Sequence, residues 1–240
     1  MKTESFERSA EELLRFLDPD GARKGILARP FIIELFGTPK SGKTTMKEML
    51  KHTLKRNGWS VSTPTEGAEV VEWTKRLEPQ YNFQTAEYAL SRARELCYGP
   101  AHRSFHVAIL DRANMDGVVR MELYRGRQVI TEAEQRVIEG YYLLPQNEQM
   151  FDLHVCLVAE PEVAIRRELA RAISKKHGET MNPQTLTDLL DAHRRVWDRL
   201  GCGANPAMCW HDSSRENEVQ TAKAILGALI KAFYRRISAL

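Results

Sequence analysis

Residues 31–44 read FIIELFGTPKSGKT, and this stretch decides how the chain folds. Its first six residues are apolar except for Glu34, are rich in β-branched and aromatic types, and lie between Pro30 and Gly37, which is typical of a short buried strand. Helical periodicity follows over residues 44–56. The stretch therefore predicts a strand, a glycine-containing loop and a helix in direct succession.

The loop matches the pattern GxxxxGK followed by Ser or Thr, which is expected by chance in roughly one chain in a hundred of this length. Its glycines let backbone N–H groups turn inward around phosphate oxygens, and the helix that follows adds its positive N-terminal end. Lys43 is expected to reach the β- and γ-phosphates of ATP, and Thr44 to ligate Mg²⁺. The alternative is a glycine turn that merely begins a helix. The predicted nucleotide-binding residues are Gly37, Thr38, Pro39, Lys40, Ser41, Gly42, Lys43, Thr44 and Thr45.

Apolar runs and helical patterns alternate along the rest of the chain. The further strands are expected at residues 59–62, 106–110, 151–158 and 207–211. This alternation predicts an α/β fold, a five-stranded parallel sheet flanked by helices on both faces. A chain of 240 residues is long enough for one core, so residues 30–240 are predicted to form a single domain. Residues 1–29, which contain an amphipathic helical pattern, are predicted to be an N-terminal helical appendage.

Composition and charge narrow the class of partner. The sequence has 42% hydrophobic residues, no apolar tract of membrane-spanning length and a formal net charge of +3. The four cysteines form no CxxC pair, so we expect reduced thiols and a cytoplasmic protein without membrane association. The small net charge does not predict nucleic-acid binding, except to a 5′ end that serves as a phosphate acceptor.

Asp111 and Arg112 carry the second half of the predicted site. Asp111 ends an apolar strand, where a carboxylate is the usual second anchor of magnesium in a fold with a phosphate loop. The alternative is an aspartate that caps a turn. Arg112 is expected either to contact a substrate phosphate or to pair with Asp111.

Three segments resemble those of thymidylate kinases and deoxynucleoside kinases. They are LDR at 110–112, ALSRARELC at 89–97 and FDLHVCLVAEPEVAIRREL at 151–169, and the resemblance runs from about residue 31 to residue 237. It implies a P-loop NTPase fold of the nucleoside monophosphate kinase type, with a helical lid at about 162–182. It also implies catalytic roles for Asp111 and Arg112, and for lid arginines that close over the phosphates, Arg167 and Arg171.

The resemblance also indicates residues on the acceptor side. Glu66 lies where deoxynucleoside kinases have a glutamate that takes the proton of the attacking hydroxyl, so it is the candidate general base. Arg92 matches an arginine of the acceptor-binding helix, and Phe83 and Gln84 are expected to touch the acceptor by stacking and hydrogen bonding. The alternatives are a solvated loop glutamate and ordinary helix-surface residues. Residues 209–214 resemble the loop that packs on the donor purine.

These features predict an enzyme, an ATP- and Mg²⁺-dependent phosphotransferase whose partner is a small-molecule phosphate acceptor, a nucleoside or nucleoside monophosphate. Two alternatives stay open. One is a nucleotide-dependent switch or slow ATPase, and the other is a P-loop kinase for a non-nucleotide hydroxyl acceptor. The sequence departs from both kinase families at 38–40 (TPK) and at Ala113, which leaves the acceptor open. The N-terminal helix and residues 124–135 are compatible with a homodimer contact or a partner site.

Overall fold

A five-stranded sheet forms the centre of the protein in the computed structural model, which describes residues 8, 29–72, 78–100, 104–170 and 180–238. The strands are β1 (Phe31–Gly37), β2 (Val61–Ser62), β3 (Val107–Asp111), β4 (Leu153–Val158) and β5 (Met208–Asp212). Their spatial order is β2-β3-β1-β4-β5, and all pairings are parallel. The predicted parallel sheet is confirmed. The predicted N-terminal appendage lies almost entirely outside the described residues.

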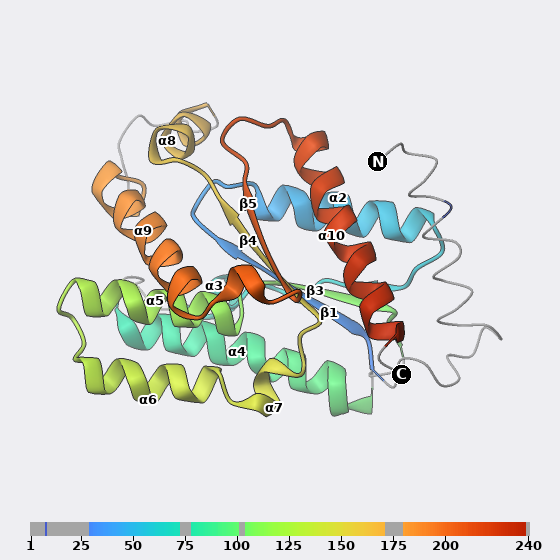
Figure 1. Cartoon of the computed structure of the whole chain (residues 1–240), viewed down its shortest axis with the longest axis horizontal. Helices are drawn as coiled ribbons and strands as arrows, with labels where there is room; N and C mark the ends of the chain where they lie inside the picture. The colour runs from blue at the N-terminus through green and yellow to red at the C-terminus, as the bar shows by residue number, and fades with distance from the viewer. Residues whose placement is uncertain (1–7, 9–28, 73–77, 101–103, 171–179, 239–240) are drawn as a thin grey trace.

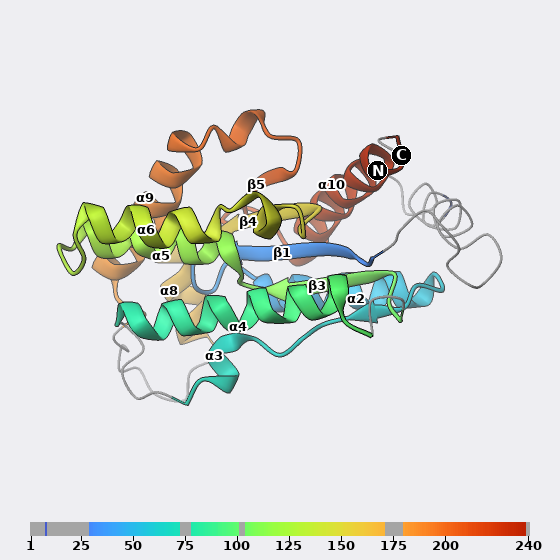
Figure 2. The ribbon, with the colours of Figure 1, turned by 90° about the horizontal axis from the view of Figure 1, so that it is seen from below.

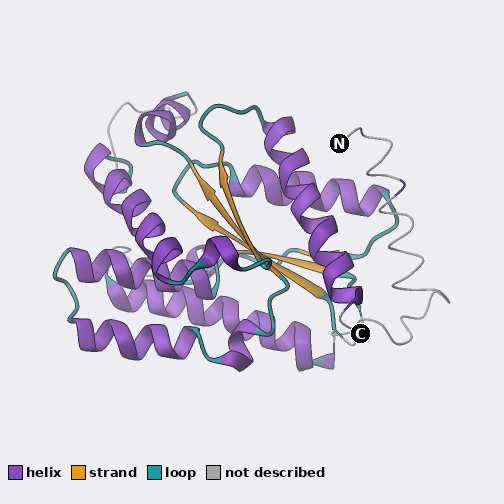
Figure 3. Ribbon diagram, viewed as in Figure 1, coloured by secondary structure: helices purple, strands orange, loops and turns teal. Residues whose placement is uncertain are grey.

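Helices cover both faces of the sheet (Figures 1 and 3). They are α2 (Lys43–Arg56), α3 (Gly67–Val70), α4 (Pro79–Tyr98), α5 (Asn114–Gly126), α6 (Glu132–Tyr142), α7 (Pro145–Glu148), α8 (Pro161–Leu169), α9 (Pro183–Arg199) and α10 (Glu218–Ser238). Helices α2 and α10 pack on one face, whereas α4, α5 and α9 cover the other, with α6 beside α5 (Figure 2). Among the helices of the described residues, none has both the length and the hydropathy needed to cross a bilayer.

The alternation of side chains along β1 divides the core into two halves. Phe31, Ile33 and Leu35 pack with α2 and α10, and the ring of Phe31 stacks on that of Phe233 at 4.0 Å. Ile32 and Phe36 point to the opposite face, toward α4, α5 and α9. Because side chains alternate, Glu34 belongs to this second face, although it is charged.

The structure moves one helix boundary and places one segment whose role the sequence left open. The apolar spacing of three or four along residues 84–98 predicts a helix over that range. Helix α4 starts five residues earlier, at Pro79, because proline is well suited to the first turn of a helix. Residues 124–135 comprise the end of α5, the connecting turn and the start of α6, and Tyr124 and Gln135 are both buried. Thr131 and Glu134 form a capping box that begins α6. The ends of this segment therefore belong to the helical layer.

Asp152 ties the first and last parts of the described chain together where β4 begins. Its carboxylate is 8% exposed and accepts hydrogen bonds from Arg29 at 2.8 Å and from the Ile32 backbone N–H at 2.8 Å, and it also pairs with Arg236. A buried carboxylate with several donors is a strong local link, because removing it leaves cations without a partner. This link lies at the end of the sheet opposite the phosphate loop (Figure 1).

Candidate functional site

The phosphate loop joins the end of β1 to the start of α2 and has the backbone geometry of an anion site. Gly37 has a φ of 133°, and a Cβ there would lie 1.7 Å from the carbonyl oxygen of Leu157, so only glycine fits. Gly42 has a φ of 100° and caps α2, while Lys40 also adopts a left-handed conformation. The loop therefore turns tightly onto the N-terminus of a helix, where backbone N–H groups favour phosphate oxygens.

Lys43 is buried beneath this loop. Its ammonium donates to the carbonyl oxygens of Gly37 at 3.1 Å and Thr38 at 2.7 Å. Burial, followed by the nearby charge of Arg112, lowers the pKa of Lys43 to about 8. The loop thus holds a desolvated cation whose charge is available to a bound phosphate.

The lowered pKa predicts that nucleotide affinity depends on pH. Free Lys43 is charged below about pH 8 and loses its proton above it, whereas a bound phosphate favours the ammonium and raises its pKa again. Affinity for an ATP analogue should therefore be full below pH 8 and fall as the pH rises through it, approaching about tenfold per pH unit. Fluorescence titrations across a pH series that brackets this value measure the effect. Lys43→Arg is the control, because a guanidinium stays charged and should flatten the profile; an equal slope in this variant would assign the effect elsewhere.

Asp111 lies at the end of β3, beside β1 and facing the loop. Its carboxylate is buried, and one oxygen contacts the ammonium of Lys47 at 3.5 Å. The other oxygen, Oδ1, is buried and has no hydrogen-bond partner among the described residues, and the same holds for the hydroxyl of Ser41. Thr44 lines the same cavity from the first turn of α2. Mg²⁺ prefers oxygen ligands and takes only one or two from the protein, so Asp111 and Thr44 fit this ion.

Arg112 and Glu66 form an ion pair on the side of the cavity where the acceptor was predicted. The Nε of Arg112 lies 3.3 Å from Oε1 of Glu66 and 4.0 Å from Oδ1 of Asp116. Burial by itself would lower the pKa of Arg112, but Asp116, Glu66 and Asp111 raise it above its usual value. Burial raises the pKa of Glu66, which precedes α3, and Arg112 offsets part of this effect. A partly desolvated carboxylate with a raised pKa has the properties of a general base.

Helix α8 and the loop after β5 are both tied to the phosphate loop. Arg167 donates to the carbonyl oxygen of Lys40 at 3.0 Å and to that of Ser213 at 2.7 Å. Lys40 in turn pairs with Glu168 at 2.5 Å, and the hydroxyl of Ser213 donates to the carbonyl oxygen of Ser41 at 2.8 Å. The guanidinium of Arg167 thus lies at the edge of the phosphate loop. Arg171 and much of the predicted lid lie outside the described residues.

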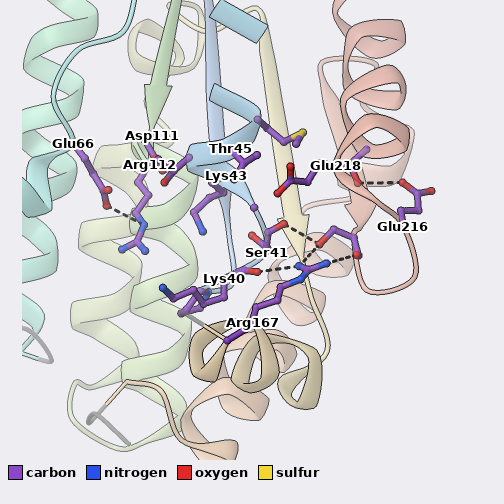
Figure 4. Close-up of a pocket in the computed structure, with 17 residues that line it drawn as sticks. Lys40, Ser41, Lys43, Thr45, Glu66, Asp111, Arg112, Arg167, Glu216 and Glu218 are labelled. Atoms are coloured by element: carbon purple, nitrogen blue, oxygen red, sulfur yellow. Dashed lines mark hydrogen bonds and ion pairs between the residues drawn. The ribbon is translucent and has the colours of Figure 1, made fainter. Parts of the chain in front are cut away.

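These groups share one cavity of about 460 Å³ (Figure 4). The predicted site residues that line it are Pro39, Lys40, Ser41, Gly42, Lys43, Thr44, Thr45, Glu66, Asp111, Arg112 and Arg167. Gly37 and Thr38 support the loop from beneath, since the Thr38 hydroxyl accepts a hydrogen bond from the Ala159 N–H at 2.9 Å. Residues from four separate segments of the sequence therefore meet at the carboxyl edge of the sheet, where ligands bind in open α/β folds.

Comparison with known proteins identifies the fold. No protein-family model and no curated protein matches the sequence. Among solved structures, the chain is similar to deoxyadenosine kinase from M. mycoides with bound dCTP, with the products dCMP and a flexible dCDP, and with bound dATP. The TM-scores are 0.59, 0.60 and 0.56 at 16%, 16% and 17% sequence identity. Each comparison covers 83% of this chain and 98% of the other. The chain has the fold of a P-loop deoxynucleoside kinase.

Within this fold the predicted acceptor residues Phe83, Gln84 and Arg92 all lie on α4, away from the cavities next to Glu66. Phe83 and Gln84 are exposed on α4, and the Phe83 ring lies 6.0 Å from the ring of Tyr142. Arg92 forms an ion pair with Glu95 on the same helix. None of the three predicted residues lines either cavity next to Glu66. Their roles as acceptor ligands stay predictions without support from the geometry.

Other residues line the small cavity next to Glu66. A second cavity, of about 20 Å³, adjoins Glu66, Asp111 and Arg112. Its remaining polar side chains are Tyr81, Asn82, Thr85 and Asp116. The sequence carried a partial signal for them, because Asp116 follows Arg112 by four residues and Asn82 and Thr85 are three residues apart on one helix face.

The large cavity also contains residues that the sequence did not indicate, together with Ser213 from the indicated segment 209–214. The loop after β5 and the start of α10 contribute Ser213, Glu216, Glu218 and Thr221 to the large cavity. His211 pairs with Glu216 at 2.8 Å and lies in the segment that resembles a purine-binding loop. Lys47, which contacts Asp111, lies one helical turn after Lys43, so its spacing gave the only signal for it.

Proposed function

We propose that the protein is an ATP- and Mg²⁺-dependent kinase that phosphorylates a hydroxyl group of a nucleoside. The observation that carries this proposal is the shared cavity, in which Lys43 and the phosphate loop face Glu66, Asp111 and Arg112. A phosphate-binding loop alone supports binding or hydrolysis. A carboxylate with a raised pKa on the opposite wall adds the group that an attacking hydroxyl requires.

The donor would lie along the phosphate loop. Backbone N–H groups, Lys43 and Arg167 place positive charge around the phosphates, and the loop after β5 lies where the donor base would extend. Asp111 and Thr44 would hold Mg²⁺, which neutralises charge on the transferring phosphoryl group when bound. The long cavity, which continues from the phosphate loop to Glu216 and Thr221, supports the binding of a whole nucleotide.

In the transfer step, Glu66 would accept a proton and Lys43 would stabilise negative charge. The acceptor hydroxyl gives its proton to the carboxylate of Glu66 as its oxygen forms a bond to the γ-phosphorus of ATP. The bond from that phosphorus to the bridging oxygen breaks, and the electron pair leaves with ADP. Lys43 stabilises the negative charge that develops on the phosphoryl and leaving-group oxygens. Arg112 orients Glu66 through their ion pair at 3.3 Å.

Glu66 favours a nucleoside over a nucleoside monophosphate as acceptor. A hydroxyl must lose a proton on attack, whereas a phosphate, whose second pKa is about 6, is already ionised at neutral pH. A carboxylate next to an anionic acceptor would also repel it, since like charges in a partly buried site interact strongly. The structural neighbours are deoxyadenosine kinases, and one of them holds dCMP as a product, which supports a nucleoside as acceptor.

The cavity beside Arg112 is too small to hold a nucleoside as it stands. The cavity beyond Arg112 has about 20 Å³, which is room for about one water molecule. A nucleoside is much larger, so side chains that line this cavity would move apart when it binds, while Arg112 keeps its ion pair with Glu66. Asp116, Asn82 and Thr85 line this place and offer it a carboxylate, an amide and a hydroxyl.

An acceptor screen tests the proposal. ATP consumption with Mg²⁺ would be measured for the protein alone and with nucleosides, nucleoside monophosphates, a 5′-hydroxyl oligonucleotide and non-nucleotide alcohols. We expect at least one nucleoside to raise the rate well above the basal level, with one ADP formed for each nucleoside phosphorylated. If only a compound of another class raises the rate, that class is the acceptor and the nucleoside proposal is wrong. If ATP binds but no compound raises the rate, a nucleotide-dependent switch is favoured.

A further inference from the structure

Glu34 is a buried charged residue in the strand that leads into the phosphate loop. It is 0% exposed, and on β1 it lies between apolar neighbours whose side chains pack in the two cores. Its position in β1 places it on the face covered by α5. An isolated carboxylate in such a place is costly unless hydrogen bonds compensate for the lost water.

The contacts of Glu34 meet that requirement. One carboxylate oxygen accepts from the backbone N–H groups of Ala113 at 2.6 Å and Asp116 at 3.1 Å. The other accepts from the backbone N–H of Met115 at 3.2 Å and from Nδ1 of His154 at 2.7 Å. Three of these four donors lie at the N-terminus of α5, where unpaired N–H groups and the helix dipole favour a negative charge.

Glu34 thus supplies a cap that the local sequence lacks. Helix α5 begins at Asn114, and its N-cap residue is Ala113, which has no side-chain acceptor. Arg112, just before it, has a φ of 64°, a left-handed conformation that is unfavourable for an L-residue because its Cβ crowds the following carbonyl oxygen. The turn at residues 111–113 is therefore unfavourable by itself and is held by a side chain from another strand.

We propose that Glu34 is a positioning residue that sets Asp111 and Arg112 relative to the phosphate loop. Glu34 and Gly37 belong to the same strand, three residues apart, so the strand that carries the loop also fixes the turn that carries Asp111. The inference rests on the proposed function, in which Asp111 holds Mg²⁺ and Arg112 orients Glu66. In this proposal, β1 aligns the phosphate-loop half of the site with the half that contains Asp111 and Arg112.

Glu34→Gln tests the proposal with little change of shape. The amide keeps one acceptor oxygen, but its NH₂ group faces backbone donors and cannot accept from them. Hydrogen–deuterium exchange of the free protein should show faster exchange of the backbone amides at 113–116, while the amides of α2 stay protected. A second readout is the ratio of ATP affinities with Mg²⁺ and with EDTA, which we expect the variant to lower about tenfold, as for an outer-shell partner of a metal ligand.

Three variants make the result decisive. Asp111→Asn should lower the same ratio without faster exchange at 113–116. His154→Asn keeps a donor toward Glu34 and all three backbone contacts, so its ratio should stay within about threefold of the wild type. Asp152→Asn removes the distant link with Arg29 and Arg236, so it should lower the thermal midpoint and leave the ratio unchanged.

The outcomes separate the two proposals. If Glu34→Gln matches Asp152→Asn, with reduced stability but an unchanged ratio and unchanged local exchange, Glu34 is an ordinary structural residue and the inference is wrong. If the wild type binds ATP equally with and without Mg²⁺, the proposed metal role of Asp111 fails. The exchange at 113–116 then still decides whether Glu34 holds the turn.

Discussion

Lys43→Ala should lower the acceptor-dependent turnover by roughly a hundredfold or more, the loss expected when one preorganised electrostatic contact worth about 3 kcal/mol is removed. Lys43 is buried under the phosphate loop, where its charge acts in a low-dielectric place and no other described lysine bonds to the loop carbonyls. Steady-state rates with saturating nucleoside and varied ATP measure the effect.

The matched control for this variant is Lys55→Ala, which removes an exposed lysine from the last turn of the same helix. It should leave turnover within about twofold, because surface charges far from the site contribute little. A thermal melt of each variant shows whether the loss of the bonds to Gly37 and Thr38 has unfolded the loop. Unchanged turnover in a folded Lys43→Ala protein would contradict the kinase proposal.

Glu66→Gln should slow phosphoryl transfer by about 10² to 10⁴-fold and leave ATP affinity nearly intact. The amide preserves the size of the side chain but cannot take the proton of the acceptor hydroxyl. Single-turnover rates report the transfer, and binding of a fluorescent ATP analogue reports the donor affinity. The pH profile adds a further readout, since the limb that reports ionisation of Glu66 should disappear from the variant.

Glu69→Gln is the control for this second variant, because Glu69 is exposed on α3, the short helix that follows Glu66. Its rate should equal that of the wild type. An equal loss of transfer rate and ATP affinity in Glu66→Gln would instead show that Glu66 acts through Arg112, whose guanidinium lies 3.3 Å away. In that case the general base would have to be sought among the other carboxylates of the small cavity, such as Asp116, whose Oδ1 lies 4.0 Å from Nε of Arg112.

Much of the fold could be predicted because its signals are local. Residues 31–36 read as a strand from their own composition. Residues 222–233 have apolar side chains at a spacing of three or four, which predicts a helix, and members such as Ile225 and Leu229 are buried in α10. Parallel pairing follows from the alternation of strands and helices, since each crossover returns the chain in the same direction. The exact start of α4 at Pro79 was missed because its first turn lacks the apolar spacing.

The phosphate-loop half of the site could also be predicted, because its signal is local in the sequence. A phosphate loop is one continuous segment, so Gly37 to Thr44 carry their chemistry in their order. The acceptor half is assembled from α4, α5 and the loop before α3, and which side chains of α4 face it depends on how that helix is rotated against α5. Phe83 and Gln84 were expected there, yet Asn82 and Thr85 line the cavity and Phe83 packs near Tyr142.

The contacts of Glu34 could not be predicted from the sequence either. In the sequence it is one charged residue within an apolar strand, with no neighbour along the chain that explains it. Its partners, Ala113 and His154, are 79 and 120 residues away and lie next to it only because β3 and β4 pair on either side of β1. No spacing rule connects such positions.

The sequence by itself determined the strand, the phosphate loop and the helix of residues 31–56, and the parallel α/β sheet around them, because these follow from local composition and periodicity. Only the tertiary structure decided which carboxylates, amides and cations face the loop. That choice depends on strand order, helix rotation and the alternation of side chains across the sheet, which bring together residues that the chain keeps far apart.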